Sequence, residues 1–137
     1  MESAIRRRDS AEPSVVDEIR RALESRDIEA FANVFAEDAV LEEISSLTPP
    51  SHPRIVEGRE AILKRLRADI LHDPVGGWTR EIDKSEIVDV VETADRVAFT
   101  EIRTYAAGDK VLAQHVAHKR GGKIARDRVV VAWDQGL

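Results

Sequence analysis

The chain contains 137 residues, of which 42% are hydrophobic and 34% charged, and its formal net charge is −5. This length suits one compact domain, and the lack of cysteine excludes disulfides, thiol catalysis and thiolate metal sites. The negative charge argues against a nucleic-acid partner, and no apolar run approaches the roughly 20 residues that span a membrane.

Residues 1–12 are expected to form a mobile tail. They contain an arginine cluster, Arg6 to Arg8, that no apolar segment follows, so they lack the pattern of a signal peptide. We therefore expect a single domain over residues 13–137, a cytoplasmic location and no membrane partner.

The stretch from Val15 to Ile44 predicts two helices followed by a strand. Apolar residues up to Leu23 recur with the 3.6-residue period of a helix, and Ser14 is a suitable N-cap. After a tight corner at 26–27, Asp27 is the expected N-cap of a second, short helix. The apolar stripe of that helix is Ile28, Phe31, Val34 and Phe35. The strand is expected over 39–44.

The rest of the chain predicts one more helix and an antiparallel meander. A proline-rich loop precedes a brief pairing segment at 55–56 and a helix over 59–71. Long strands are then expected over 79–91, 96–105, 111–118 and 123–133, joined mainly by hairpin turns that contain glycine. Helices collected at the start and a meander at the end indicate the α+β class.

Four stretches of the sequence resemble the nuclear transport factor 2-like superfamily, in its SnoaL-like and ketosteroid isomerase-like branch. They are VVDEIRRALESRDIEAFANVFAEDAVLEE (15–43), EGREAI (57–62), DRVAFTEIRTYAAG (95–108) and GGKIARDRVVVAWD (121–134). The resemblance implies a cone-shaped fold, in which a strongly curved, mostly antiparallel sheet wraps around three N-terminal helices. It also implies an apolar pocket for a small hydrophobic molecule and a homodimer formed through the outer face of the sheet.

The resemblance also assigns site residues position by position. It places the general base of the isomerases at Glu43, at the end of the first strand. The positions of the two isomerase oxyanion donors fall on Ile19 and Gln114, and the amide of Gln114 is able to donate to a carbonyl. Two positions used by the related epoxide hydrolases, an arginine and an aspartate, fall on Ile102 and Val129.

Strand alternation independently favours two carboxylates. Glu42 and Glu43 point to opposite faces of their strand, and we expect Glu43 inside, where burial makes a carboxylate a usable base near neutral pH. The alternative is a strand-end carboxylate that only hydrogen-bonds the loop. Asp127 is the polar member of an otherwise apolar face, which is typical of a buried functional acid. Its alternatives are the reverse register or an aspartate paired with an arginine.

The strand over 111–118 supplies two further candidates. Gln114 is predicted to polarise a carbonyl and His118 to shuttle protons, both on the same face as Leu112 and Val116. The alternative for both residues is a solvated position on the strand. His115 falls on the opposite face, where it is expected at a subunit interface.

The strand over 96–105 is expected to line the pocket with Thr100, Ile102 and Thr104. Its other face carries aromatic and charged residues, which suits a dimer interface. These outer residues are Phe99, Glu101, Arg103 and Tyr105. Trp78 is a candidate lid over the pocket, and its alternative role is to cap the third helix. The complete set of predicted substrate-binding residues is Ile19, Leu66, Trp78, Thr100, Ile102, Thr104, Val116, Val129, Val131 and Trp133.

These features favour a cofactor-independent enzyme of the isomerase, cyclase or dehydratase type. Glu43 would act as the base on an apolar carbonyl substrate, and Gln114 or Asp127 would donate to the oxyanion. No metal is expected, because the four histidines lack metal-binding spacing. The alternative is a non-catalytic module that binds a small hydrophobic ligand, or only dimerises and keeps a vestigial pocket.

Overall fold

The computed structural model describes residues 14–70 and 82–134, so the predicted tail and Trp78 lie outside the described residues. Within them, three helices precede most of a six-stranded sheet. The helices are α1 (Val15–Ser25), α2 (Ile28–Ala32) and α3 (Arg59–Ile70). The strands are β1 (Phe35–Ile44), β2 (Arg54–Glu57), β3 (Ile82–Glu92), β4 (Arg96–Tyr105), β5 (Lys110–Arg120) and β6 (Lys123–Trp133). No helix of the described residues is long and apolar enough to cross a membrane.

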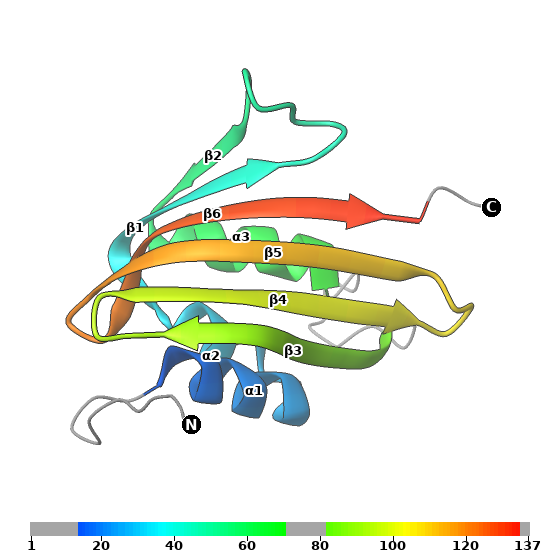
Figure 1. The fold of residues 1–137 in the computed structure, drawn as a ribbon, viewed down its shortest axis with the longest axis horizontal. Helices are drawn as coiled ribbons and strands as arrows, with labels where there is room; N and C mark the ends of the chain where they lie inside the picture. Colours follow the sequence, from blue (N-terminus) through cyan, green and yellow to red (C-terminus); the bar gives the residue numbers. More distant parts are fainter. Residues whose placement is uncertain (1–13, 71–81, 135–137) are drawn as a thin grey trace.

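The predicted α+β arrangement is confirmed. The strands lie in the order β2-β1-β6-β5-β4-β3, and only β1 and β6 run parallel to each other. Figure 1 shows the curved sheet with α3 behind β5 and β6, while α1 and α2 lie nearer the β3 edge. We call the sheet face that the helices cover the inner face, and the opposite one the outer face.

Local signals set the N-terminal ends of the first two helices as predicted. The hydroxyl of Ser14 accepts a hydrogen bond from the amide of Asp17 at 3.0 Å, and the carboxylate of Asp27 accepts one from Ala30 at 3.0 Å. Between the helices, Arg26 adopts the left-handed conformation with φ of 56°, which closes α1 and turns the chain.

The second helix is shorter than predicted, and the first strand is longer. α2 ends at Ala32, so Val34 and Phe35 do not belong to its stripe. The amide of Ile124 donates to the carbonyl of Val34 at 2.8 Å, and Phe35 pairs with Ile124 across the β1–β6 ladder. Pairing with a distant strand therefore takes Phe35 into the sheet, and leaves Val34 in the turn before it, against their local helical period.

The two hairpins of the meander form where glycine was expected to turn the chain. β5 and β6 are joined by Gly121 and Gly122, whose φ angles of 59° and 78° are those of a type I′ turn. In β3, Asp89 has a φ of 55° beside a shift in register against β4. Such a bulge increases the local bend of a strand, which helps the sheet to curve around the helices.

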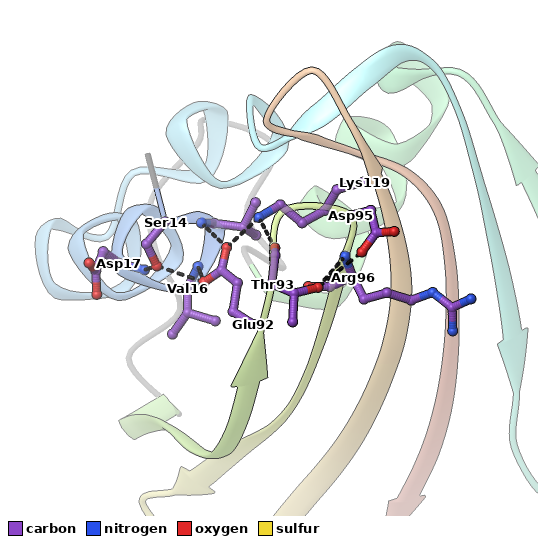
Figure 2. A network of polar contacts seen from close by, with 9 residues as sticks. Ser14, Val16, Asp17, Glu92, Thr93, Asp95, Arg96 and Lys119 are labelled. Carbon is purple, nitrogen blue, oxygen red and sulfur yellow. Dashed lines mark hydrogen bonds and ion pairs between the residues drawn. The ribbon is translucent and has the colours of Figure 1, made fainter. Parts of the chain in front are cut away.

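The N-terminus of α1 is anchored to the sheet by a buried carboxylate. Figure 2 shows Ser14 and Lys119 converging on Glu92, at the end of β3. The carboxylate accepts hydrogen bonds from the Ser14 hydroxyl at 2.7 Å, the Val15 amide at 2.7 Å and Lys119 Nζ at 2.9 Å. Burial acts to raise the pKa of Glu92, but the bonds from Lys119, Ser14 and Val15 outweigh it and hold the pKa below its ordinary value. α1 is thereby held against β3 and β5.

The main core lies between α1, α2 and the inner face of the sheet. Its members include Ile19, Phe31 and Phe99, which are 0%, 2% and 3% exposed. A smaller cluster joins Ile28, Ile70 and Ile82, so it connects α2 and α3 to the start of β3. Together the two clusters fix the helices on the inner face and leave a cavity toward the other end of the sheet.

Candidate functional site

A cavity of about 210 Å³ lies between α2, α3 and the inner face of β1, β4, β5 and β6. Apolar and aromatic side chains form most of its wall: Phe31, Phe35, Leu41, Leu66, Tyr105, Val111, Ala113, Val129, Val131 and Trp133. The remaining wall residues are all ionisable: Glu43, Arg65, Asp69, Glu101, Arg103 and His115. A mostly apolar wall that carries a few grouped polar side chains is typical of a small-molecule site.

The centre of the polar wall is a buried histidine–aspartate pair. His115 Nδ1 lies 2.7 Å from Asp127 Oδ2, and the side chains of the two residues are 10% and 0% exposed. The imidazole stacks on Phe99, with 4.5 Å between ring centroids and 12° between planes. Within the described residues, His115 Nε2 and Asp127 Oδ1 are buried polar atoms without a hydrogen-bond partner. The pair therefore keeps unused hydrogen-bonding capacity at the cavity.

The charge state of His115 depends on two carboxylates. Burial acts to lower its pKa, but Asp127 and Glu101 outweigh burial and the opposing effect of Arg103, so the pKa is raised above the ordinary value. A raised pKa favours the imidazolium, in which both ring nitrogens carry a proton. Since Nδ1 bonds Asp127, the proton on Nε2 is the one that no described residue accepts.

A second ionic group joins the end of β1 to α3. Arg65 donates from Nε to one oxygen of Glu43 and from a terminal nitrogen to the other, both at 3.2 Å. The remaining terminal nitrogen of Arg65 lies 3.3 Å from Asp69 Oδ1, one helical turn later. Glu43 is thus held at both oxygens, as in other fork-like arginine–carboxylate pairs.

A third ionic pair lies within β4. Arg103 donates to the two oxygens of Glu101 at 2.9 and 3.2 Å, and Glu101 is 1% exposed. Burial acts to raise the pKa of Glu101, but Arg103 outweighs it and holds the pKa below its ordinary value. Glu101 therefore stays ionised, and its charge acts on His115.

The three ionic groups form one chain of alternating sign along the cavity wall. From β1 to β6 the order is Glu43, Arg65, Asp69, Arg103, Glu101, His115 and Asp127, linked by contacts or by electrostatic interaction. When His115 is protonated, every carboxylate in this chain has a cationic neighbour. Such alternation lets so many charged groups remain at a largely buried wall.

One of the four predicted catalytic residues lines the cavity, and a second contacts a wall residue from behind. Glu43 lies on its wall, and Asp127, 2% exposed, lies directly behind His115. Gln114 and His118 do neither: both are exposed, and they alternate with the inner residues Ala113, His115 and Ala117. The prediction that they face the pocket is wrong, as is the placement of His115 on the outer face.

The expected face of β5 fails because its larger apolar residues point outward. Leu112 and Val116 are 37% and 58% exposed, whereas Ala113 and Ala117 are buried. Small side chains on the inner face leave room for the helices and the cavity, so apolar size is a misleading guide to this strand. The resemblance placed the oxyanion position on Gln114, whereas the residue of this strand segment that lines the cavity is the next one, His115.

The expected face of β4 is wrong for a different reason. Glu101, Arg103 and Tyr105 line the cavity, and Phe99 packs in the core, so none of the four lies on the outer face. Thr100, Ile102 and Thr104 alternate with them and belong to the outer face. Charged residues are tolerated inside this strand because Glu101 and Arg103 neutralise each other.

Of the remaining predicted substrate-binding residues, some line the cavity and others do not. Leu66, Val129, Val131 and Trp133 line the cavity. Ile19, on α1, is fully buried in the main core and is not a wall residue. Val116 is exposed on the outer face. The alternation expected of β6, with Asp127 inside, holds along the strand.

Among the wall residues that the sequence analysis did not predict, five are charged or titratable near neutral pH: Arg65, Asp69, Glu101, Arg103 and His115. One signal was present in the spacing of Arg65 and Asp69, since residues four apart lie on the same face of a helix. Another was the Glu101 and Arg103 pair, because residues two apart share a strand face and opposite charges there can be buried together. No group of three or more potential metal ligands is found among the described residues.

Comparison with solved structures shows the nuclear transport factor 2-like fold. An NTF-2 like protein of unknown function from Burkholderia xenovorans LB400 superposes with a TM-score of 0.63 and 14% identity, covering 90% of this chain and 82% of its own. A protein from Kribbella flavida, proposed to be a ketosteroid isomerase, has a TM-score of 0.62, 16% identity and coverage of 90% and 77%. A proposed polyketide cyclase from Sinorhizobium meliloti has a TM-score of 0.60, 20% identity and coverage of 85% and 94%.

These identities are low, so the structural likeness establishes the fold alone. Comparison with curated proteins finds no match to the sequence. A family model does match, and it extends from the second residue of α1 to the end of β6. On the match of the SnoaL-like domain to residues 16–134, the chain belongs to the SnoaL-like family.

Proposed function

We propose that the protein is a small-molecule enzyme of the isomerase, cyclase or dehydratase type, which moves a proton on a carbonyl-containing substrate. The observation that carries this proposal is the buried pair of His115 and Asp127 at the cavity. An imidazole that is fixed through one nitrogen and unpartnered at the other, as His115 is among the described residues, suits proton transfer.

In the proposed mechanism, His115 is the donor. The imidazolium presents its Nε2 proton to the carbonyl oxygen, which gains negative charge as the neighbouring carbon loses a proton. Asp127 keeps the ring oriented through Nδ1 and stabilises its positive charge, so it acts as a positioning residue. The stacked ring of Phe99 restricts the imidazole further.

Proton removal also needs a base on the same wall. Glu43, Asp69 and Glu101 supply three carboxylates there. The resemblance to the isomerases favours Glu43, which stands where their base stands. The apolar part of the wall suits the carbon skeleton of the substrate. The Kribbella flavida protein, a proposed isomerase, and the Sinorhizobium meliloti protein, a proposed cyclase, fit this reaction class.

The proposal is tested by hydrogen exchange of simple ketones in D₂O. A panel of enolisable cyclic and open-chain ketones is incubated with the protein, and loss of the α-proton signal is followed by NMR. His115→Gln is expected to slow the protein-dependent exchange at least about 100-fold, the low end of the effect of a general acid or base. His118→Gln, on the exposed outer face, serves as the matched control and is expected to match the wild type.

The same assay distinguishes catalysis from mere binding. Ketones that bind, as seen by shifts in their NMR signals, but do not exchange would support the non-catalytic ligand-binding alternative. Exchange at the wild-type rate in His115→Gln would rule out His115 as the donor and remove the main support for the proposal.

We also propose that the protein is a homodimer joined through the outer face of the sheet. This face carries exposed apolar side chains on neighbouring strands, with Val116 on β5 58% exposed and Val130 on β6 43% exposed. Leu112, 37% exposed, extends the same patch along β5. Apolar side chains grouped on adjoining strands are typical of a contact surface.

A further inference from the structure

The three carboxylates of the cavity wall differ in how fully their oxygens are occupied. Both oxygens of Glu43 accept hydrogen bonds from Arg65, and both oxygens of Glu101 accept hydrogen bonds from Arg103. Asp69 has only an ion-pair contact of 3.3 Å from Arg65 to Oδ1, and no hydrogen bond to it is found within residues 14–70 and 82–134. A base must have a lone pair free to receive the proton, and Asp69 meets this condition best.

The position of Asp69 on α3 destabilises its negative charge. It lies near the C-terminal end of α3 as the structure describes it, where the negative end of the helix dipole disfavours an anion. Its side chain is 33% exposed, so it reaches the cavity without being sealed in the core. A carboxylate that is poorly stabilised as an anion is a stronger base than one that is fully paired.

The charged groups around Asp69 do not cancel this effect. Burial raises the pKa of Asp69 above its ordinary value, and the negative charge of Glu43 raises it too. Arg65 on the same helix, Arg103 on β4 and Arg54 on β2 act in the opposite direction, but they do not outweigh burial. The two arginines nearest the cavity are already engaged by Glu43 and Glu101.

We propose that Asp69, and not Glu43, is the base that removes the substrate proton; this inference rests on the proposed function. The C–H bond beside the carbonyl breaks and its electron pair forms the carbon–carbon double bond of the enol. The carbonyl π pair moves to oxygen, which His115 stabilises, while Asp69 carries the proton. In isomerisation, Asp69 returns that proton to a carbon of the enol. In the exchange reaction, the proton on Asp69 is first replaced by a deuteron from D₂O, which Asp69 then delivers to carbon, so the solvent is the only further reactant.

Glu43 then has a positioning role. By holding Nε and one terminal nitrogen of Arg65, it directs the other terminal nitrogen toward Oδ1 of Asp69. Among the described residues, no hydrogen bond or ion pair reaches Oδ2 of Asp69, and we assign this oxygen to the substrate. This division explains how an acid can remain at the position of the isomerase base although an arginine fork occupies both of its oxygens.

The test uses the same ketone exchange in D₂O, with four variants of the full chain. Asp69→Asn is expected to lower the rate at least about 100-fold, and Asp69→Glu to recover part of it, because a carboxylate is restored. Glu43→Gln is expected to lower the rate less than Asp69→Asn does. Glu60→Gln, an exposed acid on the same helix, is the matched control and is expected to match the wild type.

The pH profile separates a base from a merely structural residue. In the wild type the exchange rate is expected to rise with pH through an acidic limb above the ordinary aspartate range, and Asp69→Asn is expected to lose this limb. Thermal unfolding of each variant shows whether the fold is retained. A retained limb in folded Asp69→Asn would overturn the inference.

The outcomes also separate this inference from the proposed function. If His115→Gln slows exchange but Asp69→Asn does not, Asp69 is not the base and the proposed function stands. A loss in Glu43→Gln equal to or larger than that in Asp69→Asn would likewise overturn the inference. If the wild type catalyses no exchange of any ketone, the proposed function fails and the role of Asp69 fails with it.

Discussion

His115 is a buried histidine whose surroundings favour its charged form. Asp127 faces it from β6 and Glu101 from β4, and their combined effect outweighs burial and Arg103. Its folded-state pKa is therefore above its unfolded-state value. A group of this kind stabilises the fold fully below the unfolded pKa, and that contribution is lost as pH rises through the folded pKa.

The protonation of His115 can be measured directly. We expect the NMR titration of its ring carbons to give a midpoint above the ordinary histidine value of 6.5. In Asp127→Asn the midpoint is expected to fall, because the largest charge that favours the imidazolium is gone. A wild-type midpoint at or below 6.5 would contradict the proposed role of His115 as a donor in the resting protein.

Single residues of the cavity and its surroundings differ in how well the sequence predicts whether they are buried. Asp127 was predicted to be inside because its neighbours on alternate positions are apolar, and it is buried. Glu43 reached the wall by the same alternation. Glu101 and Arg103 were expected outside because the alternate residues of the strand were assigned to the pocket, yet they are buried as a pair. Strand alternation predicts which face is buried only when the residues of that face are uniformly apolar. A buried ion pair places charged residues among them, so the pattern no longer identifies the face.

The position of α1 depends on a contact with residues that are distant in the sequence. Glu92 at the end of β3 accepts bonds from the first residues of α1, and it pairs with Lys119 of β5, whose side chain is 0% exposed. The pKa of Glu92 is held below its ordinary value of 4.5, with Lys119 as the main favourable partner. Its contribution to stability is present above the unfolded pKa and is lost as pH falls through the folded pKa.

Replacing this carboxylate tests the anchor. Glu92→Gln is expected to lower the free energy of unfolding at pH 7 by about 3 kcal/mol, because it leaves Lys119 buried and unpaired. The difference from the wild type is expected to shrink as pH falls through the folded-state pKa, since the wild-type carboxylate then becomes neutral too. Urea unfolding at pH 7 and at acidic pH measures this, with Glu24→Gln, at an exposed position of α1, as the control. A difference that stays constant on acidification would contradict the account.

The bounds of helices and strands were more predictable than which face of each strand points inward. α1, β4 and β6 begin and end as expected, because caps, hairpin glycines and apolar period all mark the same boundaries. β1 could not be predicted in full, because Phe35 joins the sheet only through its pairing with Ile124 of β6. The face of β5 could not be predicted either, since Ala113 and Ala117 are small on the side that packs.

The family resemblance drawn from the sequence is confirmed by the match over residues 16–134 and by the fold. It constrains the molecule as a whole better than it constrains the site. The same scaffold places position 43 on the cavity wall, but the resemblance assigned the oxyanion position to Gln114, which lies on the outer face. One residue of register is enough to move a strand side chain to the other face.

The proposed dimer depends on the outer face of the sheet. Val116→Arg is expected to convert the proposed dimer to a monomer, because it buries a charge without a partner in an apolar contact. Sedimentation equilibrium measures the mass, and Leu47→Arg provides a control, since Leu47 is 77% exposed in the segment between β1 and β2 and lies off this face. Wild-type protein that sediments as a monomer would contradict the dimer. A dimer that survives Val116→Arg would show that the contact involves another surface.

Because Val116 lies outside the cavity, ketone exchange by the monomer would show whether the reaction needs the dimer or only the residues of the cavity wall.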